Sequence, residues 1–349
     1  MRGWIVGIAC ASGLAAGSGC GAYRLGQPDV TYARPEPLPL VRTTTDPRWY
    51  VPILVEGAEG EALWAFFVDT GYSYTTCDDD LIAALGLQTR GKTTVRGELG
   101  KLTTTKANLP RVQLGGHLLE GLTCQVRDMD STSSIRDNSE VPIAGVLGMD
   151  VLRPFVVRMD PEQGEILLHE PSTVPRLHKD SASVVKLRRE NVFGIRSLVP
   201  VTIAGQEIWP VLDTGATGSH LDGRKLGLEP SRVREGVEVR GTGASGSAVR
   251  TIAYYEVTDL KLAGHRNGRV VIAGREGGVG AGLLGLNVLS RYIATYDFGA
   301  GFATFEPVRP RKLLTWSEWR SAYHPPEATR ILEVAPEPRG GGSRASDQR

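Results

Sequence analysis

Two acidic residues in this 349-residue chain stand in the same short motif. Asp69 and Asp213 each end an apolar run, and each is followed by Thr and Gly. Two carboxylates held about 3 Å apart cannot both ionise readily, so they share one proton. The ionised member can take a proton from water while the protonated member polarises a carbonyl, without a covalent intermediate. These residue types predict hydrolysis by general acid–base catalysis, provided that the fold brings the two aspartates together.

The residues beside each aspartate fit that chemistry. Thr70 and Thr214 carry hydroxyls that can bond across a symmetry axis to the opposite loop. Gly71 and Gly215 let the backbone turn tightly and bring an N–H group close to a carboxylate. Because two coupled carboxyls titrate as a unit, the sequence does not assign the roles of base and acid to individual residues.

The two motifs belong to an internal duplication, since six blocks recur in the same order in both halves of the chain. Residues 51–57 correspond to 199–205, and residues 145–152 correspond to 282–289. In both copies short β-branched and aliphatic runs alternate with Gly-rich turns, interrupted by few short helices. We therefore predict an all-β fold of two homologous lobes related by pseudo-twofold symmetry, which would bring the two aspartates to the axis.

The paired motifs resemble those of the retropepsin and pepsin-like clan of aspartic peptidases, here in single-chain form. The resemblance covers about residues 48–306 and includes an apolar-apolar-Gly step after each motif, at 146–148 and 283–285. It implies two retropepsin-like β-barrel lobes, with Asp69 and Asp213 as the catalytic residues and the neighbouring Thr and Gly as their support. It also implies a polypeptide substrate and no cofactor.

Members of that clan close over the substrate with glycine-rich hairpins, and the resemblance places two such flaps in this chain. Their residues would be Gly97, Glu98, Leu99 and Gly100 in the first copy and Gly241, Thr242, Gly243 and Ala244 in the second. Neither hairpin carries an obvious flap aromatic. A second departure from the family pattern is Tyr72, a large side chain at a normally small position and a candidate to crowd the site.

The sequence therefore favours an aspartic endopeptidase that hydrolyses extended polypeptides through a water activated between Asp69 and Asp213. The alternative is a non-catalytic peptide- or protein-binding module of the same fold. Because two fused copies need no second chain to complete the site, we expect a monomer. A formal net charge of +1 without a basic stripe argues against nucleic-acid binding.

Residues 1–20 have the features of an export signal. An apolar stretch at 4–16 follows Arg2 and is shorter than the roughly 20 residues of a membrane span. The layout resembles a bacterial lipoprotein signal, in which Cys20 would be lipidated and become the mature N-terminus. Gly17 stands where such signals usually carry Leu, and the alternative is ordinary signal cleavage nearby, giving a secreted protein. We expect export to the cell envelope, in the periplasm or at the outer membrane, with the lipid anchor as the membrane contact.

Composition sets the remaining boundaries. We predict a Pro-rich tether at 21–47, the first lobe at 48–170, an inter-lobe linker at 171–195, the second lobe at 196–307, a short helix at 308–324 and a disordered tail at 325–349.

Two further groups of residues lie in the first copy. Cys77 and Cys124 are candidates for one disulfide outside the cytoplasm, and the alternative is a buried thiol at Cys77. The run from Asp78 to Asp80 is interpreted as N-capping charge for the helix that follows it. No group of histidines has metal-ligand spacing, so we expect no metal.

Overall fold

The computed structural model describes residues 27–44, 46–57, 60–97, 100–129, 141–175, 183–190, 195–240, 247–274, 282–309, 312–322 and 329–331. Among these residues strands predominate, which confirms the all-β prediction. The helices are short and comprise α1 (Asp79–Ala84), α3 (Met149–Leu152), α4 (Leu286–Leu289) and α5 (Trp316–Ala322). Within the described ranges, no helix is long and apolar enough to cross a membrane.

The first lobe is built on an eleven-stranded sheet. In spatial order its strands are β1 (Asp29–Thr31), β9 (His117–Glu120), β8 (Val112–Leu114), β29 (Thr329–Ile331), β3 (Tyr50–Gly57), β4 (Gly60–Val68), β11 (Ile143–Leu147), β5 (Thr76–Asp78), β10 (Thr123–Arg127), β7 (Gly100–Asn108) and β6 (Arg90–Gly97).

The second lobe is built on an eight-stranded and a four-stranded sheet. The larger sheet contains β15 (Arg188–Glu190), β16 (Arg196–Leu198), β19 (Val211–Leu212), β26 (Leu283–Leu284), β20 (Ser219–Leu221), β25 (Val270–Gly274), β22 (Ser247–Val257) and β21 (Arg232–Arg240). The smaller contains β18 (Gln206–Ile208), β17 (Val201–Ile203), β23 (Lys261–Leu262) and β24 (His265–Arg266).

The strand order repeats between the lobes, as the duplication predicts. The order β3-β4-β11-β5-β10-β7-β6 in the first lobe corresponds to β16-β19-β26-β20-β25-β22-β21 in the second. The strand directions repeat as well: β4 and β19 run parallel to β11 and β26, and β5 and β20 run parallel to β10 and β25. Each motif aspartate therefore follows an equivalent strand, β4 or β19.

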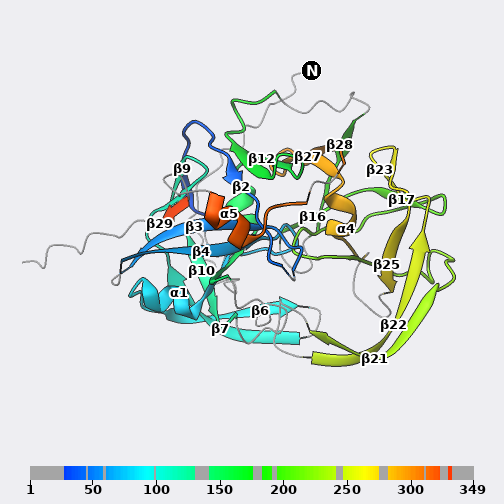
Figure 1. The fold of residues 1–349 in the computed structure, drawn as a ribbon, viewed down its shortest axis with the longest axis horizontal. Coiled ribbons are helices and arrows are strands. Elements are labelled where there is room, and N and C mark those ends of the chain that lie inside the picture. The colour runs from blue at the N-terminus through cyan, green and yellow to red at the C-terminus, as the bar shows by residue number, and fades with distance from the viewer. Residues whose placement is uncertain are drawn as a thin grey trace, which may run out of the picture.

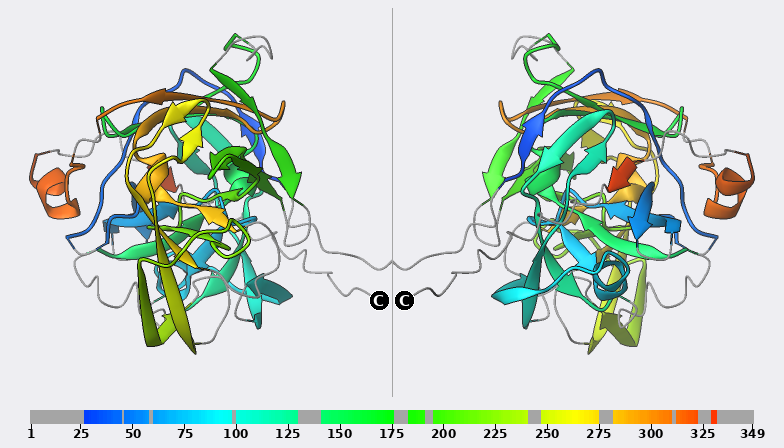
Figure 2. Two further views of the ribbon diagram at one scale, coloured as in Figure 1. Left: turned by 90° about the vertical axis from the view of Figure 1, so that its right-hand side faces the viewer. Right: turned by 90° about the vertical axis from the view of Figure 1, so that its left-hand side faces the viewer.

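A six-stranded sheet joins the two lobes, and its strands are β14 (Val184–Lys186), β28 (Phe302–Pro307), β27 (Tyr292–Asp297), β12 (Val156–Asp160), β13 (Glu165–His169) and β2 (Leu38–Pro39). At its centre β12 of the first copy pairs antiparallel with β27 of the second, with Met159 opposite Ala294. This sheet lies along the upper side of the molecule in Figures 1 and 2, and the β6–β7 and β21–β22 hairpins lie along the lower side.

The β4 strand contributes to two apolar clusters because its side chains alternate between the sheet faces. Phe66 and Val68 belong to the main core, which extends through both lobes. Phe67 belongs to a second cluster, formed by Val41, Tyr50, Ala65, Phe67, Met129, Val141, Ile143, Val146, Trp316 and Trp319. The two tryptophans come from α5, which lies on the outside of the first lobe (Figure 2).

Parts of the expected tether and tail belong to the folded body, which corrects those expectations for the residues concerned. Within 21–47, β1 pairs with β9 and β2 pairs with β13. The N–H of Ala33 also donates to Nδ1 of the buried His117 (3.0 Å). Within 325–349, β29 lies between β3 and β8. Extended backbone can pair with the open edge of a sheet, so a composition that disfavours helices does not exclude order.

The expected linker also contains paired strands. Within 171–195, β14 pairs with β28 and β15 pairs with β16, so this segment joins the inter-lobe sheet to the second lobe. The α5 helix lies within 308–324, where a short helix was expected.

Candidate active site

The two motif loops begin with the same backbone bonds. The N–H of Asp69 donates to the carbonyl of Leu147, and the N–H of Asp213 donates to the carbonyl of Leu284, both at 3.0 Å. Leu147 and Leu284 are the second apolar residues of the two apolar-apolar-Gly steps, so these steps run beside the catalytic loops. A Cβ at the next residue, Gly148, would lie 2.7 Å from backbone carbon of Tyr74. Glycine is therefore required where the step passes closest to the loop.

The threonine hydroxyls connect the two loops. Thr70 Oγ1 donates to the carbonyl of Leu212 (2.9 Å) and accepts the N–H of Thr214 (3.1 Å). Thr214 Oγ1 donates to the carbonyl of Val68 (2.8 Å) and accepts the N–H of Thr70 (3.1 Å). Both threonines are buried, where such bonds are not weakened by competing water. This reciprocal set, anticipated as bonds across the symmetry axis, fixes one loop against the other.

Gly71 and Gly215 pack against the carboxylates of the opposite loops. A Cβ at Gly71 would lie 2.7 Å from each carboxylate oxygen of Asp213. A Cβ at Gly215 would lie 2.6 Å from Oδ1 of Asp69. The N–H of Gly71 also donates to Oδ1 of Asp69 (2.8 Å). The two aspartates therefore meet at the axis, and only glycine leaves room for them.

Asp69 and Asp213 are electrostatically coupled. Asp69 is buried, and Asp213 is partly buried. Burial raises the pKa of Asp69, and the hydrogen bond from Gly71 opposes that rise. Burial also raises the pKa of Asp213 well above its ordinary value, and the charge of Asp69 raises it further. The pair therefore keeps a proton at a pH at which two isolated carboxyls would have lost both.

Each loop is supported by a polar side chain from the short helix after the apolar-apolar-Gly step. Asp150 accepts the N–H (2.9 Å) and the hydroxyl (2.8 Å) of Thr75. Asn287, its counterpart in the second lobe, accepts the hydroxyl of Ser219 (2.7 Å). Asp150 is buried, and burial raises its pKa to about 6. The sequence aligned Asp150 with Asn287 but did not assign them a role.

Tyr72 is partly buried and packs against the second cluster. Burial raises the pKa of its hydroxyl. Its carbonyl accepts the N–H of Met149 at 2.8 Å, and the carbonyl of Ala216 accepts that of Leu286 at the same distance. Tyr72 therefore makes the same backbone hydrogen bond as Ala216, its small counterpart in the second lobe.

The two predicted flap hairpins end on the same side of the molecule (Figure 1). β6 ends at Gly97 and β7 begins at Gly100, while Glu98 and Leu99 lie outside the described residues. In the second lobe β21 and β22 form the equivalent hairpin, and four of its predicted flap residues lie outside the described ranges: Gly241, Thr242, Gly243 and Ala244. Cys20, the predicted lipidation site, also lies outside them.

Cys77 and Cys124 are joined by a disulfide, with their Cα atoms 5.7 Å apart. The bond connects β5 to β10, two neighbouring parallel strands of the first lobe. Both residues are fully buried.

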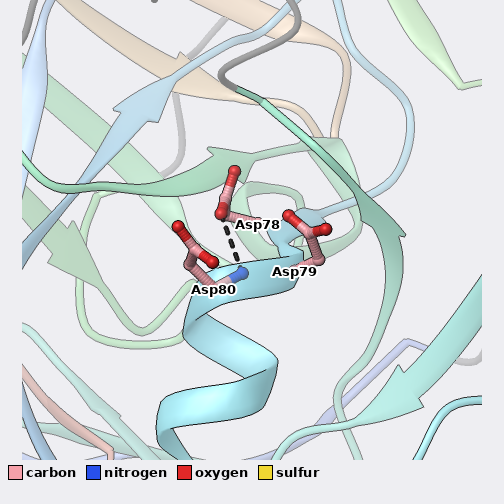
Figure 3. A group of neighbouring side chains, drawn as sticks. All are labelled: Asp78, Asp79 and Asp80. Carbon is pink, nitrogen blue, oxygen red and sulfur yellow. Dashed lines mark hydrogen bonds between the residues drawn. The ribbon is translucent and has the colours of Figure 1, made fainter.

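The acidic run at 78–80 lies at the start of α1 (Figure 3). Asp78 accepts the N–H of Asp80 through Oδ1 (2.9 Å) and the N–H of Met129 through Oδ2 (2.8 Å). Asp78 therefore caps the helix, as the sequence predicts. The three carboxylates lie close enough together to hold an ion, but Asp79 and Asp80 are exposed and both oxygens of Asp78 already accept backbone donors. This geometry is that of a helix cap and does not define a metal centre.

Comparison with known families identifies the class of protein. The family model described as aspartyl protease matches residues 51–151 and 199–288, which is more than half of the chain. The chain therefore belongs to the aspartyl protease family, and its two matched regions are the two retropepsin-like lobes. No curated protein matches the sequence. Among solved structures, a retropepsin-like aspartic protease from Rickettsia conorii aligns with a TM-score of 0.27 and 15% identity, over 35% of this chain and 93% of that chain.

Proposed function

We propose that this protein is an aspartic endopeptidase that hydrolyses peptide bonds of extended polypeptides through a water activated between Asp69 and Asp213. The observation that carries the proposal is the meeting of the two carboxyls, each packed against the glycine of the opposite loop. The threonine bonds between the loops hold this geometry in place before substrate arrives. A binding module needs no such pair of facing acids.

The proposed reaction uses the single proton that the pair shares. The ionised carboxylate takes a proton from water as the water oxygen attacks the scissile carbonyl carbon, and the protonated carboxyl donates to the carbonyl oxygen. The resulting tetrahedral diol collapses as the C–N bond breaks: the leaving amine takes a proton from the pair, and one diol hydroxyl returns its proton to the pair as the carboxylic acid product forms. The pair then again holds one proton.

The substrate strand would lie between the dyad and the two hairpins. Backbone groups of the hairpin strands β6–β7 and β21–β22 would bond to it in the manner of an added β-strand. Such bonds read the backbone of an extended chain and not its side chains, which favours polypeptides as the substrate class.

Hydrolysis of an unfolded protein mixture between pH 3 and 8 tests the proposal. New N-termini should appear with the parent protein, disappear with Asp213→Asn, and be suppressed by a statine-type inhibitor. Asp222→Asn is the matched control, because Asp222 is an aspartate of the same lobe that pairs with Lys225 away from the dyad. Circular dichroism checks that each variant is folded. A folded parent without hydrolysis at any pH would contradict the proposal and favour the non-catalytic binding module.

A further inference from the structure

An arginine lies opposite each motif aspartate in the sheet register. β3 and β4 are antiparallel with Tyr50 opposite Phe67, and the bond from the N–H of Val68 to the carbonyl of Trp49 (2.9 Å) extends that pairing. The same register places Arg48 opposite Asp69, which precedes the motif threonine. Side chains two residues apart on a strand lie on the same face of the sheet, so Arg48 shares the face of Tyr50 and Asp69 shares the face of Phe67. Because Tyr50 and Phe67 are directly opposite, Arg48 and Asp69 lie on the same face.

The second lobe repeats the arrangement. β16 and β19 are antiparallel with Leu198 opposite Val211, so Arg196 lies opposite Asp213 on the same face. Directly opposed residues of an antiparallel pair have Cβ atoms about 4.5–5.5 Å apart, which is within reach of an arginine side chain. Arg48 and Arg196 are also equivalent in the duplication, because each stands three residues before the repeated block that begins at 51 or 199.

Each arginine is held by an acidic partner on its outer side. Arg48 is almost fully buried, donates from Nε to Oδ2 of Asp46 (2.6 Å), and lies with its guanidinium carbon 5.0 Å from the ring centre of Phe67. The hydroxyl of Tyr50 donates to the same oxygen of Asp46 (2.9 Å). Arg196 pairs with Glu190 at 2.6 Å, and both side chains are largely buried.

Besides burial, which raises the pKa of both aspartates, charged groups from both lobes act on the dyad. Arg48 and Arg196 both act on Asp69 and lower its pKa, and Arg196 lowers that of Asp213. The negative charge of Asp69 acts on Asp213 and on the hydroxyl of Tyr72. Asp46, Tyr50 and Glu190 lie beyond the arginines. The two cations thus oppose the effect of burial, which raises the pKa of both carboxyls.

We propose that Arg48 and Arg196 are positioning residues that hold the shared negative charge of the dyad and set the pH range in which it is singly ionised. The inference rests on the proposed function, since it explains how the dyad is kept singly ionised, the state that the proposed reaction requires. The arginines do not touch the reacting atoms. Their acidic partners reduce the field that each cation exerts, so the pairs Asp46–Arg48 and Glu190–Arg196 together determine its strength.

This assignment predicts shifts of opposite sign for the two members of one pair. Arg196→Gln removes a cation, so both limbs of the pH profile of kcat/KM should move up by about 1 pH unit, a tenfold change in proton concentration. Glu190→Gln removes the negative charge that pairs with Arg196, so both limbs should move to lower pH. Arg196→Lys keeps the charge and should restore the parental profile. If the arginine had a purely structural role, its replacement would narrow the pH profile or lower its maximum without shifting both limbs along the pH axis.

Two further variants complete the design. Arg48→Gln should also move the limbs up, but it leaves the buried Asp46 without its cation and so can prevent folding. The paired variant Asp46→Asn with Arg48→Gln avoids that problem and should still move the limbs to higher pH, since Arg48 is the member of the pair that lies opposite Asp69 in the register and lowers its pKa. Arg269→Gln is the matched control, because Arg269 forms an exposed pair with Glu256 and should leave the profile unchanged.

Titration of the dyad by carboxyl carbon NMR separates this inference from the proposed function. Samples labelled at the aspartate carboxyl carbons need no turnover, and Asp213→Asn assigns the dyad signals. Upward and downward shifts in Arg196→Gln and Glu190→Gln support the inference even if the parent hydrolyses nothing. If the dyad titrates identically in the parent and in both variants, the inference about the arginines is wrong. Hydrolysis by the parent that is lost in Asp213→Asn would still support the proposed function in that case.

Discussion

The glycines of the two motifs leave no room for a side chain beside the carboxylates of the opposite loops. A methyl group at position 215 would stand against the carboxylate of Asp69 and displace it. Since misplacement by about 1 Å can lower a rate by about 100-fold, we expect Gly215→Ala to reduce kcat/KM by at least that factor. Gly218→Ala is the matched control, because a Cβ there meets no atom within 4 Å. Equal activity of the two variants on a peptide substrate would contradict this reasoning.

Asp150 carries a prediction about stability and pH. Its pKa is raised from 3.8 to about 6, so its contribution to folding is fully present below about pH 4 and is lost as the pH rises through 6. Asp150→Asn, which copies Asn287 of the other lobe, should remove that loss. The shift corresponds to about 3 kcal/mol. Urea unfolding should therefore show the variant gaining stability over the parent between pH 4 and pH 7.5, whereas parallel curves would contradict the prediction.

At the scale of elements, the disulfide between β5 and β10 stands where the second lobe has two buried apolar side chains. The equivalent strands β20 and β25 carry Leu221 and Ile272, both fully buried, at the positions of Cys77 and Cys124. The disulfide closes a loop with a sequence separation of 47 residues. In the chain-entropy description, a loop of that size stabilises the fold by about 4 kcal/mol.

Reduction should therefore lower the free energy of unfolding of the parent by about that amount. The measurement is urea unfolding with and without reductant. The double variant Cys77→Ala with Cys124→Ala is the control, because it should be less stable than the oxidised parent and insensitive to reductant. A parent with the same transition in both conditions would contradict the prediction.

The duplicated blocks predicted that the two lobes repeat one arrangement of strands around the site, because each block is a local strand or turn whose role repeats, but they did not predict the order of those strands. They also predicted that Thr70 and Thr214 bond across the axis. The pairing of β1, β2 and β29 was not predictable, because a strand of two or three residues gains its order from partners that are distant in the sequence. Arg48 and Arg196 were missed for a similar reason: their relation to the aspartates depends on strand register, which composition and motifs do not reveal.

At the scale of the whole molecule, one chain supplies both halves of the site and the sheet that joins them. The β12–β27 pairing lies on the side of the molecule opposite the β6–β7 and β21–β22 hairpins (Figures 1 and 2). A separate copy of the chain would add no residue to the dyad. This architecture is consistent with the proposed monomer.

The expected attachment of this protein to a membrane rests on Cys20 of the signal segment. We propose that Cys20 is lipidated after export, because acyl chains contribute about 0.8 kcal/mol per buried CH₂ and two or more chains anchor a protein stably. The parent should enter the detergent phase of a Triton X-114 extract and incorporate labelled palmitate, and Cys20→Ser should do neither. Cys10→Ser is the matched control, since Cys10 lies within the apolar stretch that would be removed. A parent that stays in the aqueous phase, with a free mature N-terminus near Ala22, would instead establish ordinary signal cleavage and a secreted enzyme.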